Sequence, residues 1–156
     1  MLAAGGALAL ILGDNIFYGH DLGQTLAAAR MRIEGATVFV CPVQDSQRYG
    51  AIEYGAGRKA LSIAEKPRML KSHYAVTGPY FHDGSVCDIA AGLCPAARGE
   101  FEITGINQAY LSAGRLQLEL MRRAMAWCDS GPTNPCSMPR NASPPSKNAG
   151  PESRGA

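Results

Sequence analysis

The sequence predicts an α/β fold, and three consecutive stretches near its start carry that prediction. Residues 7–13 form an apolar run that ends at a glycine, and an acidic residue, Asp14, follows at once. Residues 21–34 place apolar side chains at helical spacing, and Gly35 suits the position just after a helix. Residues 36–43 are apolar and β-branched. Strand, helix and strand make a βαβ unit, which predicts a parallel pair, and such apolar runs suit strands buried on both faces of a sheet.

The remaining predicted elements alternate between strands and helices. We expect strands at residues 50–54, 60–64, 74–81, 116–120 and 124–128, and helices at residues 85–93 and 103–113. Residues 55–57 are small and turn the chain between the first two of these strands, which therefore form a hairpin. Over residues 116–120 leucines alternate with Gln and Glu, a pattern typical of a strand with one exposed face.

Composition narrows the class of protein. The 156 residues suffice for one ordinary domain, and 46% apolar with 18% charged residues indicates a soluble globular chain. The net charge of +2 comes from scattered Lys and Arg, so no nucleic-acid partner is expected. No segment reaches the roughly 18 apolar residues that span a membrane, and residues 1–12 lack the basic start of a signal peptide. The five cysteines form no CxxC pair, and we expect reduced thiols in the cytoplasm.

Two acidic residues are candidates for a metal site. In open α/β sheets ligands bind beyond the carboxyl ends of the strands, which is where Asp14 falls. Its carboxylate is a hard oxygen donor suited to Mg²⁺, although an Asp here could equally cap the next turn. Asp129 also follows an apolar segment, and the two carboxylates could hold one Mg²⁺ between them.

Further candidates follow the predicted hairpin. Lys66 is a compact cation suited to a phosphate, and Glu65 can accept hydrogen bonds from sugar hydroxyls; alternatively the two form a surface ion pair. Gly50 marks either a close approach of backbone to a ligand or a simple turn.

The block from Leu12 to His20, LGDNIFYGH, closely resembles the signature of glucose-1-phosphate thymidylyltransferases, which belong to the sugar-nucleotide pyrophosphorylase family of nucleotidyltransferases. The resemblance covers roughly residues 7–131, and its further blocks occur in order. They are Arg48-Tyr49-Gly50, Glu65-Lys66-Pro67, Tyr74-Ala75-Val76-Thr77-Gly78, Ala97-Arg98-Gly99-Glu100 and Trp127-Cys128-Asp129-Ser130-Gly131.

The resemblance implies a Rossmann-like mixed sheet of the nucleotide-diphospho-sugar transferase type. It also implies transfer of a nucleotidyl group from dTTP to glucose 1-phosphate with Mg²⁺, in a cytoplasmic homo-oligomer (a tetramer) that serves dTDP-sugar and surface polysaccharide biosynthesis. By resemblance Asp14 and Asp129 bind the metal and, with Lys66, are catalytic. The residues implied to bind the substrates are Asn15, Gly50, Glu65, Lys66, Val76, Tyr80 and Trp127. From the residues alone, Val76 and Tyr80 could be plain strand core, and Trp127 a core aromatic.

The sequence departs from the family pattern at both ends. It contains no Gly-Gly-x-Gly-Thr-Arg-Leu loop, the element whose backbone amides hold the triphosphate, so we expect an incomplete fold and an internal fragment. Residues 1–131 are predicted to be a partial nucleotidyltransferase domain. Residues 132–156 hold six of the ten prolines and read as a disordered tail that a frameshift after Gly131 put out of frame. Gly105 stands where the family has Asp, and Pro79 and Cys128 are also atypical.

These departures leave two alternatives open. The chain could be a remnant without activity of its own, because the triphosphate-binding loop is not in the sequence. It could also come from a relative that uses UTP or ATP, since the residues that would read the base are not in the sequence either.

Overall fold

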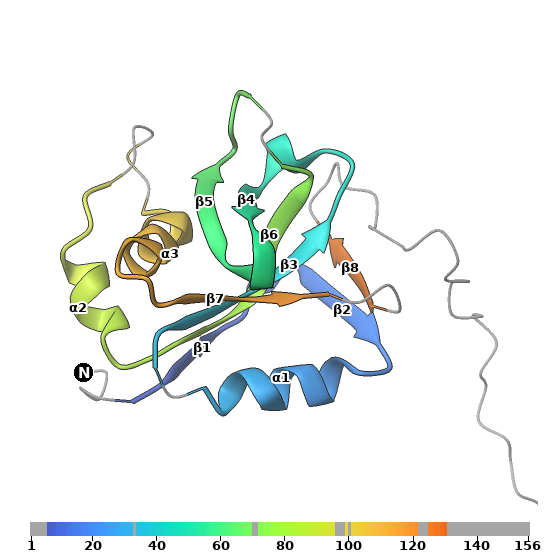
Figure 1. Cartoon of the computed structure of the whole chain (residues 1–156), viewed down its shortest axis with the longest axis horizontal. Coiled ribbons are helices and arrows are strands. Elements are labelled where there is room, and N and C mark those ends of the chain that lie inside the picture. Colours follow the sequence, from blue (N-terminus) through green and yellow to red (C-terminus); the bar gives the residue numbers. More distant parts are fainter. Residues whose placement is uncertain are drawn as a thin grey trace, which may run out of the picture.

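The structure is a computed structural model, and it describes residues 6–32, 34–69, 72–95, 99, 101–121 and 125–130 (Figure 1). Its main sheet has six strands. Five follow the order β5-β4-β6-β3-β7, and β1 joins the same sheet by pairing with β6. The strands are β1 (Leu8–Leu10), β3 (Ala36–Pro42), β4 (Gly50–Tyr54), β5 (Ala60–Glu65), β6 (Tyr74–His82) and β7 (Leu116–Leu120).

The longest strand, β6, organises the sheet. It lies antiparallel to β3 along one edge, and along its other edge it pairs first with β4 and then with β1. The parallel neighbour of β3 is β7. The predicted mixed α/β sheet is therefore confirmed, but the predicted parallel pairing of the first strand with residues 36–43 is wrong. Those two strands point the same way with β6 between them, because a helical crossover does not require its two strands to be neighbours.

The first apolar run is less buried than its composition predicts. Only three of its residues are in a strand, and the side chain of Ile11 is 64% exposed. The expectation of burial on both faces is wrong here because β1 pairs along one edge only, and among the described strands none pairs with the other edge. Large apolar side chains remain exposed at Leu10 and Leu12 as well.

A second, two-stranded sheet was not predicted. It pairs β2 (Asn15–Gly19) antiparallel to β8 (Met125–Asp129). Along β2 the exposed side chains of Ile16 and Tyr18 alternate with half-buried residues, which is the period-2 pattern of a strand with one wet face. The sequence carries this pattern, but five residues that directly follow a turn are too short a signal to predict a strand, and the partner strand β8 lies far along the sequence.

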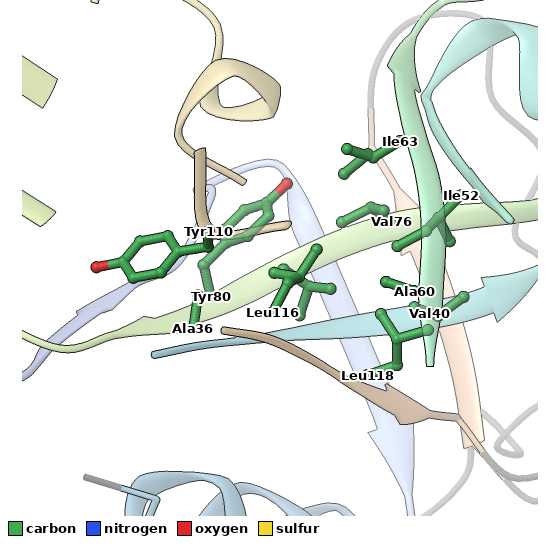
Figure 2. Packing of buried hydrophobic residues seen from close by; sticks show 11 residues of the cluster. Ala36, Val40, Ile52, Ala60, Ile63, Val76, Tyr80, Tyr110, Leu116 and Leu118 are labelled. Carbon is green, nitrogen blue, oxygen red and sulfur yellow. The ribbon is translucent and has the colours of Figure 1, made fainter. Parts of the chain in front are cut away.

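Helices α2 (Val86–Ala91) and α3 (Ile103–Ser112) cover one face of the main sheet. Figure 2 shows the core between α3 and the sheet, where Tyr110 of α3 lies beside Tyr80 of β6 and Leu116 of β7. On the opposite face a second cluster joins the sheet to β8 and to the start of α1 (Leu22–Arg30). Its buried members are Cys41, Ala75, Met121, Met125 and Trp127. The β2–β8 ladder therefore packs on the face of the sheet away from α3.

Two sequence expectations need local correction. The helix α1 ends at Arg30 with Met31 as its C-cap, so Gly35 does not cap it. Gly35 has φ +82°, and a Cβ at this position would lie 2.2 Å from the carbonyl oxygen of Arg115, so the need for glycine comes from a close backbone approach.

Cys41, Cys87 and Cys94 are free thiols as expected, but the expectation of reduced cysteines is wrong at Cys128, which is disulfide-bonded.

In the part of the chain that the structure describes, no helix is both long and apolar enough to cross a membrane. The predicted tail, residues 132–156, and the residue that precedes it lie outside the described residues, and so do Arg98 and most of the block around it. The tail and its frameshift origin stay predictions.

Candidate active site

The two predicted metal-binding aspartates meet at one end of the β2–β8 ladder. Asn15 pairs with Asp129 in register, and Asp14 stands one residue before that pair. The backbone N–H of Ser130 donates to the carbonyl oxygen of Asp14 at 2.7 Å, and its hydroxyl donates to the same oxygen at 2.9 Å. The alternative role for Asp14 in a turn has support, since Asp14 lies in the turn that the N–H of Asn15 closes by donating to the carbonyl oxygen of Leu12 at 3.2 Å. It does not cap a helix, because α1 starts only at Leu22.

Trp127 joins this ladder end to the core. Its ring is 3% exposed and its indole N–H donates to Oδ1 of Asn15 at 2.6 Å. The amide nitrogen of Asn15 in turn donates to Oδ1 of Asp14 at 2.7 Å. The sequence allowed two roles for Trp127, a core aromatic or a neighbour of the site. In the structure Trp127 has both positions, since it is buried and it contacts Asn15.

Tyr49, which belongs to the Arg48-Tyr49-Gly50 block, connects two parts of the site. Its ring packs edge-on against Trp127, with centroids 4.9 Å apart. Burial raises the pKa of Tyr49, and the negative charge of Asp129 raises it further, which places the phenol within the field of that carboxylate. The carbonyl oxygen of Tyr49 accepts the backbone N–H of Lys66 at 3.0 Å. Tyr49 therefore bridges the β2–β8 end and the end of β5.

Glu65 is the last residue of β5, one residue beyond the predicted strand end, and Lys66 follows the strand. A residue that was not predicted holds Glu65. The hydroxyl of Thr104, on α3 and 4% exposed, donates to Oε2 of Glu65 at 2.5 Å. The other carboxylate oxygen lies 3.9 Å from Nζ of Lys66. The ion pair offered as the alternative is therefore present, but Glu65 is also anchored to a helix, which a simple surface pair would not need. The Thr104 contact was missed because nothing in the sequence pairs residues that far apart.

Gly50 opens β4 and has no positive φ, so the alternative of a turn glycine is wrong. A Cβ at Gly50 would lie 3.3 Å from Oγ1 of Thr104 and 3.4 Å from Oε2 of Glu65. Gly50 is therefore closely approached by the hydrogen-bonded side chains of Thr104 and Glu65, and its predicted approach to a ligand stays a prediction.

The backbone of Lys66 is strained. Its φ of +38° lies in the left-handed region, where a residue other than glycine costs on the order of 1–3 kcal/mol. The hydrogen bond from its N–H to Tyr49 holds this conformation, and its half-exposed side chain leaves the end of β5 beside Glu65. Strain of this kind gathers at functional sites, which fits the predicted role of this lysine.

The buried phenol of Tyr80 is affected by the carboxylates of Glu65 and Asp14. Tyr80 is 4% exposed on β6, and burial, together with the negative charges of Glu65 and Asp14, raises the pKa of its phenol to about 12. The same phenol therefore lies in the electrostatic field of both Glu65 and Asp14. Val76 lies on the same strand opposite Gly50, and Figure 2 shows Val76 and Tyr80 within the core on β6. Both residues are strand core, and both lie beneath the site.

This site lies in a chain whose relatives share one chemistry. A sequence profile of the family described as nucleotidyl transferase matches residues 1–135. The chain belongs to the nucleotidyl transferase family. It is 53% identical over 122 residues to the glucose-1-phosphate thymidylyltransferase of Xanthomonas campestris, covering 78% of this chain and 41% of that protein. It is 50% identical over 125 residues to the enzyme of the same name from Mycobacterium tuberculosis, covering 80% of this chain and 43% of that protein.

Solved structures of nucleotidyl transferases agree with the fold. A Bacillus anthracis protein assigned as a glucose-1-phosphate thymidylyltransferase, solved with sucrose, matches with a TM-score of 0.67 and 40% identity over 81% of this chain and 50% of that one. A UDP-glucose pyrophosphorylase solved with UDP-glucose matches with a TM-score of 0.71 at 20% identity, which supports the fold alone. The chain thus spans under half the length of the curated relatives named above, as the predicted internal fragment requires.

Proposed function

We propose that this chain supplies the sugar-phosphate and metal-binding part of a glucose-1-phosphate thymidylyltransferase. The reaction would transfer a nucleotidyl group from dTTP to glucose 1-phosphate and give dTDP-glucose and pyrophosphate. The observation that supports this most directly is Tyr49, whose ring packs against Trp127 with centroids 4.9 Å apart and whose carbonyl oxygen accepts the N–H of Lys66 at 3.0 Å. It indicates that the proposed sugar-binding residues and the proposed metal-binding residues belong to one site.

The residues fit a magnesium ion that binds together with its substrate. Within the described ranges no cluster of three or more His, Cys, Asp or Glu side chains could hold a metal by itself. The chain instead offers the carboxylates of Asp129, the last residue of β8, and of Asp14, which directly precedes β2. Mg²⁺ is usually held by one or two carboxylates plus substrate phosphates and water, so this donor set suits it better than a metal that needs a complete protein cage. When bound, the ion would neutralise phosphate charge.

The remaining residues would bind and orient the sugar phosphate. Lys66 would contact the phosphate, since its ammonium is half-exposed and lies 3.9 Å from Oε1 of Glu65. Oε2 of Glu65 is anchored by Thr104, which leaves Oε1 directed at Lys66 and able to accept a bond from a sugar hydroxyl. Gly50 and Val76 would line the sugar pocket without occupying it. An oxygen of the sugar phosphate would then bond to the α-phosphorus of dTTP as the bond to the leaving pyrophosphate breaks, with no covalent enzyme intermediate.

The proposal extends to compartment and assembly. Both substrates are small phosphorylated metabolites, so the cytoplasm is the proposed location. A homo-oligomer, a tetramer by resemblance, is proposed for the complete enzyme, and size-exclusion chromatography with light scattering would test it.

A second candidate has its own support. The chain spans 41% of the Xanthomonas relative, and its sequence contains no Gly-rich loop of the family type. A non-catalytic remnant is therefore the competing function, and a relative that uses UTP or ATP is the third.

Magnesium-dependent release of pyrophosphate separates these candidates. The purified chain is given glucose 1-phosphate with dTTP, UTP or ATP, first alone and then with a separately made polypeptide that carries the Gly-rich loop of a thymidylyltransferase. We expect turnover with dTTP only in the second arm, and a loss of about 100-fold or more with Lys66→Ala. Turnover by the chain alone would exclude the remnant, and no turnover in either arm would reject the proposed enzyme.

A further inference from the structure

Asn15 is held between a buried donor and an exposed acceptor. Its Oδ1 accepts the indole N–H of Trp127 at 2.6 Å, and its Nδ2 donates to Oδ1 of Asp14 at 2.7 Å. An indole N–H can only donate, so it must face the oxygen of the Asn15 amide. The amide nitrogen must then point the other way, toward the carboxylate. The orientation of this amide is thus decided by chemistry as well as by position.

The anchor of this arrangement is rigid. Trp127 is 3% exposed and packs in the cluster that contains Cys41, Ala75 and Met125, with the ring of Tyr49 edge-on against it. Asp14, by contrast, is exposed, so its own surroundings restrain its carboxylate little. The hydrogen bond from Asn15 is the contact that transmits the fixed position of the indole to the carboxylate.

We infer that Asn15 is a positioning residue, which Trp127 holds in one orientation so that its amide N–H fixes the Asp14 carboxylate for the metal. This inference rests on the proposed function, in which Asp14 binds Mg²⁺. It adds to the predicted role of Asn15 in binding substrate, because the two bonds use one of the two amide hydrogens and one of the two lone pairs of the oxygen. Partners that orient a metal-binding carboxylate typically change metal affinity by about 10–100-fold when removed.

The first test does not depend on any metal. Trp127 is the sole tryptophan of the sequence, so the full 156-residue chain labelled with ¹⁵N gives a single indole N–H signal. We expect Asn15→Ala to move this signal upfield and to speed its exchange with solvent at least about tenfold, the factor for loss of one hydrogen bond. Asp14→Ala should also move the signal, and that movement should disappear when Asn15 is already Ala. An effect of Asp14→Ala that persists at full size in the Asn15→Ala background would overturn the inference.

The second test measures metal binding. Mn²⁺ serves as a paramagnetic probe, followed through the relaxation of water protons without substrate or turnover. We expect Asn15→Ala to weaken Mn²⁺ binding about 10–100-fold. Trp127→Phe keeps a six-membered aromatic ring in the cluster but removes the donor together with the five-membered ring that carries it. Because the Asn15 amide stays in place, this variant should weaken binding by a smaller factor. This second variant also keeps the test valid if Asn15→Ala does not fold.

Ile16→Ala is the matched control. Ile16 is the next residue along β2, is 59% exposed and has no part in the site, so its replacement should leave both the indole signal and Mn²⁺ affinity unchanged. Parent-like Mn²⁺ affinity in both Asn15→Ala and Trp127→Phe would refute the positioning role. If the parent chain binds no Mn²⁺, the proposed metal site fails, and the indole signal alone then decides whether Asn15 couples Trp127 to Asp14.

Discussion

Replacement of Asp83 by Asn should be the most damaging single change outside the proposed site. Asp83 is buried just after β6, and Oδ1 accepts the N–H and hydroxyl of Ser85 and the hydroxyl of Tyr110. Oδ2 accepts the N–H of Gly35 at 2.7 Å and the guanidinium of Arg115. An Asn amide has nearly the same shape, but its NH₂ group would face Gly35 and Arg115, and both of these groups are donors. Two hydrogen bonds would be lost and one buried N–H would have no acceptor.

The expected loss follows from these contacts. Breaking a buried charged network by changing one partner costs about 3–5 kcal/mol, against a total stability of about 5–15 kcal/mol for a domain. Tyr110→Phe removes a single bond to the carboxylate and should cost about 1.5–3 kcal/mol. Urea unfolding followed by the fluorescence of Trp127 measures both. A loss below about 1 kcal/mol for Asp83→Asn would refute the reasoning, because such a value is typical of an exposed pair.

The pH dependence of the unfolding free energy provides a second test of the role of Asp83. Burial alone would raise the pKa of Asp83, but hydrogen bonds from Ser85, Gly35 and Tyr110 hold it well below its ordinary range. A lowered pKa in the folded state means that the stabilisation is complete above the unfolded value of about 3.9 and is lost as the pH falls below it. The difference in unfolding free energy between parent and Asp83→Asn should therefore stay constant down to about pH 5 and shrink below about pH 4.

Three glycine substitutions test other parts of the structure. Gly105→Ala in α3 should raise the unfolding free energy in urea by about 0.5–1 kcal/mol, since the new Cβ would lie an ordinary 3.4 Å from Leu93. Gly35→Ala should lower it by about 3 kcal/mol, because the Cβ would meet the carbonyl of Arg115 at a residue with φ +82°. Gly50→Ala should weaken glucose 1-phosphate binding about tenfold in calorimetry, because it presses on the Thr104–Glu65 contact, while the unfolding midpoint changes little.

Much of the fold could be predicted because its elements have strong local signals. The hairpin of β4 and β5, the helix α3 and the strands β3, β6 and β7 all occur within a few residues of the ranges expected from periodicity and turn residues. Which strands pair with each other could not be predicted from such local signals. Which strand neighbours β3 depends on contacts between residues far apart in sequence, and β6 entered between the two strands of the predicted βαβ unit.

The candidate site likewise contains residues that the sequence predicted and residues that it did not. Asp14, Glu65, Lys66 and Asp129 were found from motifs, because their chemistry is visible in the residues themselves. The support for these groups was not visible, since Thr104 contacts Glu65 from another element across 39 positions. The role of Asn15 was also missed, because it depends on a tryptophan 112 positions away.

These supporting contacts explain how the site is built in a chain that spans under half the length of its relatives. Val76 and Tyr80 belong to the core of β6, Trp127 is buried against that sheet, and Thr104 comes from the helix that covers its other face. The residues that support the proposed binding residues are therefore the same residues that form the core around the sheet. Within the described residues, the phenol of Tyr80 lies in the electrostatic field of both Glu65 and Asp14. Loss of activity from this chain would then point to triphosphate binding, whereas loss of Mn²⁺ binding would point to the β2–β8 end itself.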